Sequence, residues 1–372
     1  MDLIPLAYTL TGIGVYVQQL ISAIHRTDPA LKIAYPTHCE LPIPALLKAL
    51  ISRNLDRGDV QKLDVQPRFG FSPFGPFRHY GSSELACDGC DLYHVTSTVS
   101  KYRTYRCPTV VSVYDLADLR LDGKDSGSYE WLLPQIRAAR VNLCISQVTQ
   151  RDVIELLDVP EERTMVTPLA PRPLFVPPSS DLQRGLCRAR LNGGNPYFLA
   201  VSTIEPRKNY VRMVEAFSLL RERGCDHQLI IAGAKRSAWP EVKAKIDSLG
   251  IANAVQVLGW VSNQRLLELM WGATALLYPS LYEGFGLPIV EAMATGTPVV
   301  ASNAGSIPEV VGDAMPMVDA YSVESIAEGM ERAREDSESL ELRSRLKAQA
   351  AKFSWDQTAS RTIDAYQRAL ET

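Results

Sequence analysis

Short runs of apolar, often β-branched residues alternate along the chain with longer stretches in which apolar residues recur every three or four positions. The short runs predict buried strands, and the longer stretches predict helices with one apolar face. The predicted strands are Thr109–Tyr114, Val141–Ile145, Tyr197–Val201, Gln228–Ala232, Thr274–Tyr278 and Thr297–Ala301. The predicted helices are Gly14–His25, Asn209–Arg223, Trp239–Ser248, Asn263–Trp271 and Val323–Glu335. Alternation of this kind predicts an α/β fold with parallel sheets covered on both faces.

The alternation is interrupted at 168–180 (PLAPRPLFVPPSS), where prolines are too dense for a helix or a central strand. Stretches of similar length flank this break, so we expect two doubly wound, Rossmann-like domains facing each other across a cleft. We place the N-terminal domain at 1–172 and the C-terminal domain at 173–354. The remainder, 355–372, predicts a terminal helix capped by Ser354 that packs back on the N-terminal domain. Only Met1–Leu6 is available for a strand before the Thr11–Gly14 loop, so we expect either that the first strand is short or that residues are missing upstream.

Composition narrows the class of protein. The 372 residues are 46% hydrophobic and 22% charged with a formal net charge of −3, which excludes a disordered chain and gives no basic excess for nucleic acid. An odd count of seven cysteines argues against a disulfide framework and for a reducing compartment. The pair Cys87 and Cys90 has no second pair at zinc-ligand spacing and is predicted to be structural. The absence of a long apolar run or a signal peptide predicts a cytoplasmic protein.

Two loops lie where a strand gives way to a helix. In Thr11–Gly14, Gly12 and Gly14 would let a ligand approach the backbone at a helix N-terminus, although a tight turn explains them equally well. In the loop 202–209 (STIEPRKN), Arg207 and Lys208 lie near a helix N-terminus, where the helix dipole disfavours cations. This placement indicates an anionic ligand such as a diphosphate. The alternative is a solvated charge pair beside Glu205.

The segment 281–294 (LYEGFGLPIVEAMA) is the most informative. Glu283 precedes the predicted helix, and Glu291, eight positions later, lies on its second turn. Between them, the amides of Phe285 to Leu287 are expected at the helix N-terminus, because Pro288 favours the first turn. Amide donors suit a phosphate, and carboxylates suit the hydroxyl groups of a sugar.

These motifs, together with 295–314 (TGTPVVASNAGSIPEVVGDA), resemble the family 4 retaining glycosyltransferases of GT-B fold (glycosyl transferases group 1), in particular its mannosyltransferases. The segments Tyr93–Ser97 and Val110–Leu116 resemble strands of the family's N-terminal domain. The resemblance implies that Arg207 and Lys208 bind the donor diphosphate and that Glu283 contacts the transferred sugar. It also implies that Glu291 holds the ribose hydroxyls.

Further roles follow from the same resemblance. Its donor-binding positions also include Ser202 and the turn formed by Phe285, Gly286 and Leu287. Gly12 and Gly14 match a loop that approaches the diphosphate and the acceptor. Val261, after a strand expected to end at Trp260, matches the wall beside the nucleotide base. Where the family often has histidine, this chain has Tyr114, which can donate a hydrogen bond but stays uncharged near neutral pH. We therefore count Tyr114 among the candidate catalytic residues.

The function implied is a retaining glycosyltransferase that moves a hexose, with mannose from GDP-mannose as first choice. The acceptor would be a glycan or a polyprenyl-diphosphate-linked glycan in polysaccharide or lipopolysaccharide biosynthesis. Without a D-x-D motif we expect no metal and no cofactor. The alternatives are a rhamnosyl- or other hexosyltransferase using a GDP-, dTDP- or UDP-sugar, and a non-catalytic nucleotide-sugar-binding partner protein.

One segment indicates where in the cell the protein is located. Pro42–His79 mixes apolar residues with six basic ones against three acids. It predicts either peripheral contact with an anionic membrane at the inner face of the cell membrane or a surface helix over the core.

Overall fold

The computed structural model describes residues 1, 12–36, 61–63, 90–96, 107–123, 127 and 129–371, with 34–36 and 61–63 by backbone alone. The predictions for Thr11, Cys87 and most of Pro42–His79 lie outside the described residues. The chain divides into two compact units. Unit 1 comprises Met1–Leu169 and Ser354–Thr372, and unit 2 comprises Ala170–Phe353. The predicted boundaries at 172/173 and 354/355 are therefore displaced by three residues and by one, which assigns Arg172 to unit 2.

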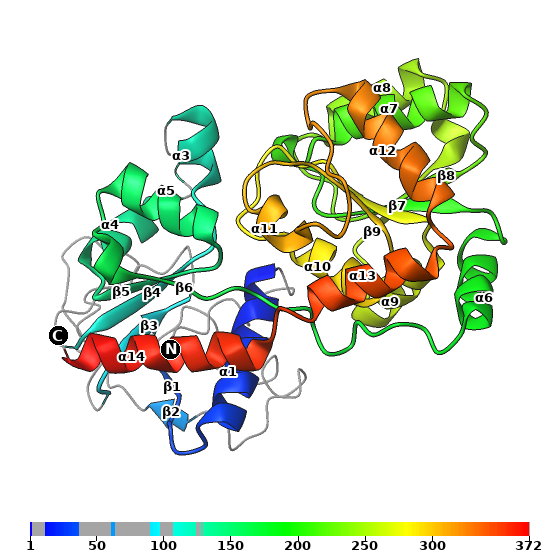
Figure 1. Cartoon of the computed structure of the whole chain (residues 1–372). Coiled ribbons are helices and arrows are strands. Elements are labelled where there is room, and N and C mark those ends of the chain that lie inside the picture. Colours follow the sequence, from blue (N-terminus) through cyan, green and yellow to red (C-terminus); the bar gives the residue numbers. More distant parts are fainter. Residues whose placement is uncertain are drawn as a thin grey trace, which may run out of the picture. The chain divides into compact units, whose positions relative to one another are not determined.

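Unit 1 contains a four-stranded parallel sheet in the order β3-β4-β5-β6 and a parallel pair β1-β2 (Figure 1). The strands are β1 Ala34–Pro36, β2 Gln61–Leu63, β3 Tyr93–Val95, β4 Thr109–Val113, β5 Val141–Cys144 and β6 Thr164–Val166. The helices are α1 Gly12–Thr27, α3 Ala117–Asp122, α4 Leu132–Ala138, α5 Gln147–Leu157 and α14 Trp355–Glu371, with a 3₁₀ turn at Glu161–Arg163.

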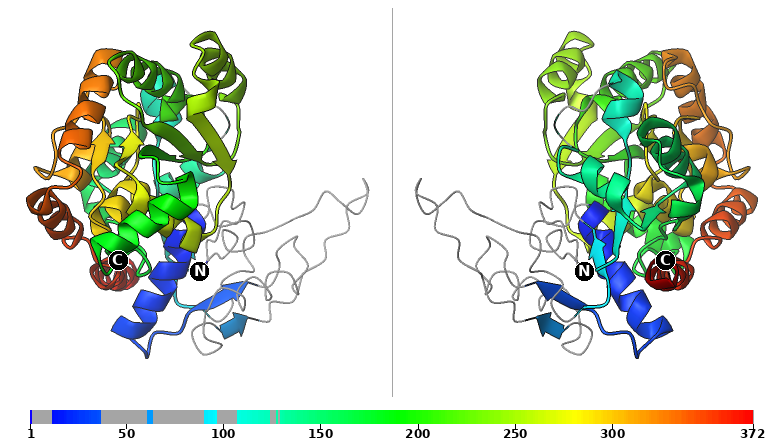
Figure 2. Two further views of the ribbon diagram at one scale, coloured as in Figure 1. Left: turned by 90° about the vertical axis from the view of Figure 1, so that its right-hand side faces the viewer. Right: turned by 90° about the vertical axis from the view of Figure 1, so that its left-hand side faces the viewer.

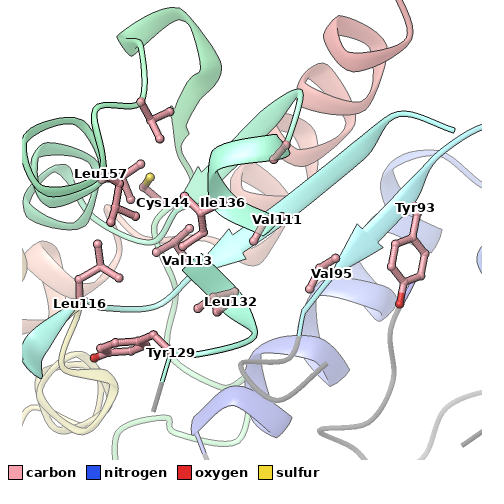
Figure 3. Packing of buried hydrophobic residues seen from close by; sticks show 13 residues of the cluster. Tyr93, Val95, Val111, Val113, Leu116, Tyr129, Leu132, Ile136, Cys144 and Leu157 are labelled. Atoms are coloured by element: carbon pink, nitrogen blue, oxygen red, sulfur yellow. The ribbon is translucent and has the colours of Figure 1, made fainter. Parts of the chain in front are cut away.

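The core of unit 1 forms where the buried strand faces meet α4 and α5 (Figure 3). Val111 and Val113 of β4 and Val95 of β3 are fully buried, as is Ile136 of α4. Burying side chains of this size contributes about 1.5–3 kcal/mol each. The continuous apolar runs therefore form interior strands of a covered parallel sheet, as the sequence predicts.

The C-terminal helix α14 lies alongside α1 in unit 1 (Figures 1 and 2). A buried chain of hydrogen bonds joins the two helices through the sheet. Tyr16 of α1 bonds the Ser112 hydroxyl (2.8 Å), which bonds Nε2 of His94 (2.8 Å), whose Nδ1 bonds the Tyr366 hydroxyl of α14 (2.7 Å). Burial lowers the pKa of His94 to about 3, so the imidazole is neutral. At the start of α14 the Ser354 hydroxyl accepts from the amide of Asp356 (3.2 Å), as expected of a cap.

Unit 2 is a five-stranded parallel sheet in the order β11-β10-β7-β8-β9. The strands are β7 Tyr197–Val201, β8 Gln228–Ala232, β9 Val255–Gly259, β10 Ala275–Tyr278 and β11 Val299–Ala301. The helices are α6 Asp181–Asn192, α7 Tyr210–Glu222, α8 Trp239–Ser248, α9 Asn263–Gly272, α10 Leu287–Ala294, α11 Ile307–Val311, α12 Val323–Glu335 and α13 Leu340–Ala350, with 3₁₀ turns at Pro206–Lys208 and Ala252–Ala254. Both units are doubly wound α/β sheets, as predicted.

Most predicted elements are present, and the corrections concern their ends. Helix α1 begins at Gly12, so Gly12 and Gly14 lie in its first turn and not in a preceding loop. Helix α7 begins at Tyr210, because Asn209 adopts a left-handed conformation (φ 60°). The strand before Val261 ends at Gly259 and not at Trp260, since Gly259 has positive φ. Such positive φ values are incompatible with continuing a strand or a helix.

Two further observations concern cysteines and membranes. Among the described cysteines, Cys90, Cys144, Cys187 and Cys225 are free thiols, whereas Cys107 is disulfide-bonded. Cys107 is thus an exception to a chain expected to remain reduced. No helix in the described part of the chain is both long enough and apolar enough to cross a bilayer.

Candidate active site

The strand order of unit 2 identifies one position in the sheet as the place for a ligand. The connections from β7 lead outward through β8 to β9, and the chain then returns to place β10 on the other side of β7. In open α/β sheets ligands bind beyond the carboxyl ends of the strands at such a reversal. The residues that follow β7 and β10 are Ser202–Asn209 and Pro279–Gly286, the two loops singled out in the sequence.

The first loop carries its two cations in a 3₁₀ turn, Pro206–Lys208, placed directly before α7. Pro206 opens the turn, and Asn209 ends it with left-handed backbone. The Asn209 amide group then donates to the carbonyls of Pro279 (2.9 Å) and Ala320 (2.7 Å). The loops are also joined by the Leu281 amide, which donates to the Arg207 carbonyl (2.8 Å). The backbone carrying the cations is therefore fixed to the loop that carries Glu283.

Glu283 brings both cations together. Its Oε1 accepts from Nζ of Lys208 at 2.5 Å, and its Oε2 accepts from Nη1 of Arg207 at 3.0 Å. The Lys208 ammonium also donates to the Tyr278 hydroxyl (3.2 Å). Side-chain exposure is 6% for Glu283, 8% for Lys208 and 29% for Arg207. Arg207 is thus the member of this triad that solvent reaches most easily.

The electrostatics of the triad are dominated by burial and by the two cations. Burial alone would raise the pKa of Glu283, but Lys208 and Arg207 outweigh it and bring the pKa below the ordinary value. Glu283 is therefore ionised at neutral pH. Tyr278, buried beside this carboxylate, has its pKa raised well above the ordinary value, by burial first and by Glu283 second. Tyr278 thus remains a neutral hydroxyl.

The turn before α10 presents amide donors. Gly286 caps the helix with φ 98°, and Leu287 and Pro288 begin it. Among the described residues, the amides of Phe285, Gly286 and Leu287 have no hydrogen-bond partner. The Phe285 ring is buried and packs edge-on against Phe353 (5.5 Å between centroids), which fixes the turn. Unpaired amides at a helix N-terminus suit an anion or a hydroxyl oxygen.

Glu291 lies on the second turn of α10 with a side-chain exposure of 1%. Both of its oxygens accept from Arg172, at 2.5 Å from Nε and 2.8 Å from Nη2. Burial raises the pKa of Glu291 above the ordinary value, and Arg172 partly offsets this increase. The sequence showed Arg172 only as part of a proline-rich connection, so nothing in the local pattern indicated this pairing.

The remaining predicted residues are placed as follows. The Ser202 hydroxyl bonds the hydroxyl of Tyr210 (2.9 Å) at the carboxyl end of β7. Val261 lies in the turn between β9 and α9. Tyr114 follows β4 in unit 1, and its hydroxyl donates to the Thr96 carbonyl at 2.6 Å. The structure thus joins Arg207, Lys208 and Glu283 directly, whereas Tyr114, Gly12 and Gly14 belong to the other unit.

Sequence reasoning also missed the support behind Glu283. The Ser306 amide (3.1 Å) and hydroxyl (2.9 Å) both donate to the Glu283 carbonyl. Gly305, with φ 56°, approaches so closely that a Cβ there would lie 2.6 Å from the same carbonyl oxygen. Glycine is thus required at 305 both by conformation and by space. The sequence SNAGS offered a turn signal but not the partner of that turn.

Comparisons with known proteins show which family domain contains the two loops. Residues 188–353, which contain both loops, match the family "Glycosyl transferases group 1". The chain is 29% identical over 97% of both chains to O-antigen chain mannosyltransferase B of Escherichia coli. It is 30% identical to the serotype-specific mannosyltransferase WbdA of Escherichia coli, over 64% of this chain and 30% of that protein.

Among solved structures, HepE of Anabaena in complex with UDP and glucose superposes with a TM-score of 0.75 at 19% identity, covering 96% of each chain. This likeness shows the fold. The matched family model and the mannosyltransferase relatives identify residues 188–353 as a glycosyl transferases group 1 domain, within a chain whose two doubly wound units have the GT-B fold.

Proposed function

We propose that this glycosyltransferase transfers mannose from GDP-mannose, with retention of anomeric configuration, to a growing glycan. The observation that carries the proposal is the convergence of Arg207, Lys208 and Glu283 at the reversal of the sheet, beside the unpaired amides of α10. The choice of mannose rests on the names of several relatives, which are mannosyltransferases. The acceptor class, a glycan or a polyprenyl-diphosphate-linked glycan, rests on the O-antigen relative.

The basic pair would bind the diphosphate of the donor. As the bond from the sugar's anomeric carbon to the phosphate oxygen breaks, negative charge grows on the leaving diphosphate. Cations already fixed in a water-poor site stabilise this charge without reorganisation. The acceptor hydroxyl forms the new bond on the same face of the sugar, and its proton passes to the departing phosphate oxygen. The sugar carries positive charge in such a transition state, as in glycoside hydrolysis.

The two glutamates would divide the recognition of the donor. Glu283, ionised and adjacent to the cations, would accept from hydroxyls of the transferred sugar, and Glu291 would accept from the ribose hydroxyls. The amides of Phe285, Gly286 and Leu287 would donate to sugar or phosphate oxygens. Arg207 and Lys208 then supply the positive charge that a metal supplies in other transferases, so we propose transfer without a metal.

The first test is mannosyl transfer from radiolabelled GDP-mannose to polyprenyl-diphosphate-linked glycan, with Arg207→Ala as the variant. Loss of a donor to developing charge lowers turnover about 10²–10³-fold. Arg223→Ala, an exposed arginine just after α7, is the matched control and should keep full activity. Undiminished transfer by Arg207→Ala would refute the assignment.

Three readouts test the finer points. The one-bond C1–H1 coupling constant of the transferred sugar, measured by NMR, reports whether its anomeric configuration is retained or inverted. Transfer after treatment with EDTA reports metal dependence, and activity restored only by Mg²⁺ or Mn²⁺ would contradict the metal-free proposal. A panel of GDP-, dTDP- and UDP-sugars separates mannosyl from rhamnosyl or other hexosyl transfer. Binding without hydrolysis or transfer of any of them would indicate the non-catalytic alternative.

A further inference from the structure

The side chain of Arg172 occupies the acceptor groups of Glu291. Its Nε and Nη2 donate to the two carboxylate oxygens at 2.5 and 2.8 Å. A carboxylate offers about four lone-pair sites. The guanidinium therefore occupies two of them, one on each oxygen.

The pair is also closed to solvent. Glu291 has a side-chain exposure of 1%, and Arg172 has 12%. A ribose therefore cannot reach the carboxylate oxygens while the guanidinium stays in place. Since the guanidinium is the more exposed partner, it is the group that can move aside.

Three contacts hold the Arg172 side chain over Glu291. The Phe175 amide donates to the Arg172 carbonyl (2.9 Å), which closes a turn with Pro173 in its centre. The guanidinium lies over the Phe175 ring, with 4.4 Å from Cζ to the centroid, and its Nη1 donates to Asn263 Oδ1 (2.6 Å). Each of these contacts favours the closed position. Asn263 begins α9, two residues after Val261, so the same guanidinium spans from α9 to α10.

We propose that Arg172 is an internal competitor of the nucleotide: its guanidinium closes Glu291, and the ribose hydroxyls must displace it to bind. This inference rests on the proposed function, which assigns Glu291 to the ribose. Displacement lowers the apparent affinity for the nucleotide by the fraction of molecules that are open. Arg172 thereby sets the donor concentration at which the enzyme becomes occupied.

The test compares GDP with 2′,3′-dideoxy-GDP by isothermal titration calorimetry at pH 8 on the full chain. The variants are Arg172→Gln, Arg172→Lys and, as control, Arg345→Gln, an exposed arginine of α13 whose Nε donates to the Ala314 carbonyl. If nine of ten molecules are closed, Arg172→Gln tightens GDP binding about tenfold. Arg172→Lys, which cannot form the bidentate pair, should give a smaller gain. Dideoxy-GDP, which has no hydroxyl for Glu291, should bind wild type and variant about equally.

The ratio of the dissociation constants of dideoxy-GDP and GDP decides whether Arg172 competes with the ribose or positions Glu291 for it. Competition predicts that the preference for GDP over dideoxy-GDP rises in Arg172→Gln. If Arg172 instead positions Glu291 for the ribose, this preference falls, and the inference is overturned. Unchanged affinities in Arg172→Gln would overturn it as well.

Glu291→Gln separates this result from the proposed function. If Glu291→Gln keeps the wild-type preference for GDP over dideoxy-GDP, the ribose assignment itself fails and takes the inference with it. If Glu291→Gln abolishes the preference for GDP while Arg172→Gln does not raise it, the assignment stands and only the competition is refuted. Circular dichroism and thermal unfolding of each variant verify that unit 2 is folded.

Discussion

Replacing Glu283 with glutamine tests whether its carboxylate stabilises the cations Lys208 and Arg207, and whether the donor diphosphate can take over that role. The substitution keeps the size of the side chain and removes the charge shared by Lys208 and Arg207. Breaking a buried ion pair costs about 3–5 kcal/mol, because the remaining charge stays out of water. Because Arg207 is 29% exposed, solvent screens its interaction with Glu283. We therefore expect a loss of stability at the lower end of this range, about 3 kcal/mol.

For a unit of this size, about 1 kcal/mol lowers the melting temperature by roughly 2–4 °C, which predicts a decrease of about 6–12 °C for Glu283→Gln. Differential scanning calorimetry on the full chain measures it, and the transition that GDP raises identifies unit 2. The phosphates of GDP would restore a partner to the cations. GDP should therefore raise the melting temperature of Glu283→Gln more than that of the wild type, while mannosyl transfer stays low.

Glu241→Gln, on the exposed side of α8, is the matched control because its carboxylate lies at the surface of the same unit. If Glu283→Gln melts within about 2 °C of this control, the buried pair contributes nothing and the reasoning fails. If GDP raises the melting temperatures of variant and wild type equally, the cations do not bind the diphosphate.

Three further outcomes are expected. Gly305→Ala should lower both stability and transfer, because its Cβ would meet the Glu283 carbonyl at 2.6 Å; Gly250→Ala, with φ 68° and open space, shares only the backbone strain and should keep full transfer. The unfolding free energy should fall by about 1.6 kcal/mol between pH 6.5 and 5 through His94, since its folded pKa of about 3 means that only the unfolded chain gains the proton. His94→Gln should remove this component from urea titrations, and an unchanged pH slope would contradict it. Lys208→Met should leave Glu283 without its nearest cation, raise the pKa of that carboxyl and abolish transfer; substantial residual transfer would contradict the role given to Lys208.

Much of the fold could be read from local pattern. The strands Tyr197–Val201 and Gln228–Ala232 and the helices Trp239–Ser248 and Val323–Glu335 have the bounds that the sequence predicted. Interior parallel strands must be apolar throughout, and helices must carry one apolar face, so both leave a periodic signal. The ends were less accurate, because they depend on single residues such as Asn209 and Gly259 that adopt positive φ.

The sequence by itself determined which residues carry charge and which turns carry glycine: the cations of STIEPRKN, the glutamates eight residues apart and the helix start at Pro288. Those are local properties, decided within a few residues along the chain. Only the tertiary structure decided their partners. Arg172 meets Glu291 across 119 residues of sequence, Lys208 meets Glu283 across 75, and Tyr366 meets His94 across 272. Such pairings arise when strand order and helix packing bring distant segments of the chain together, and no local pattern records that arrangement.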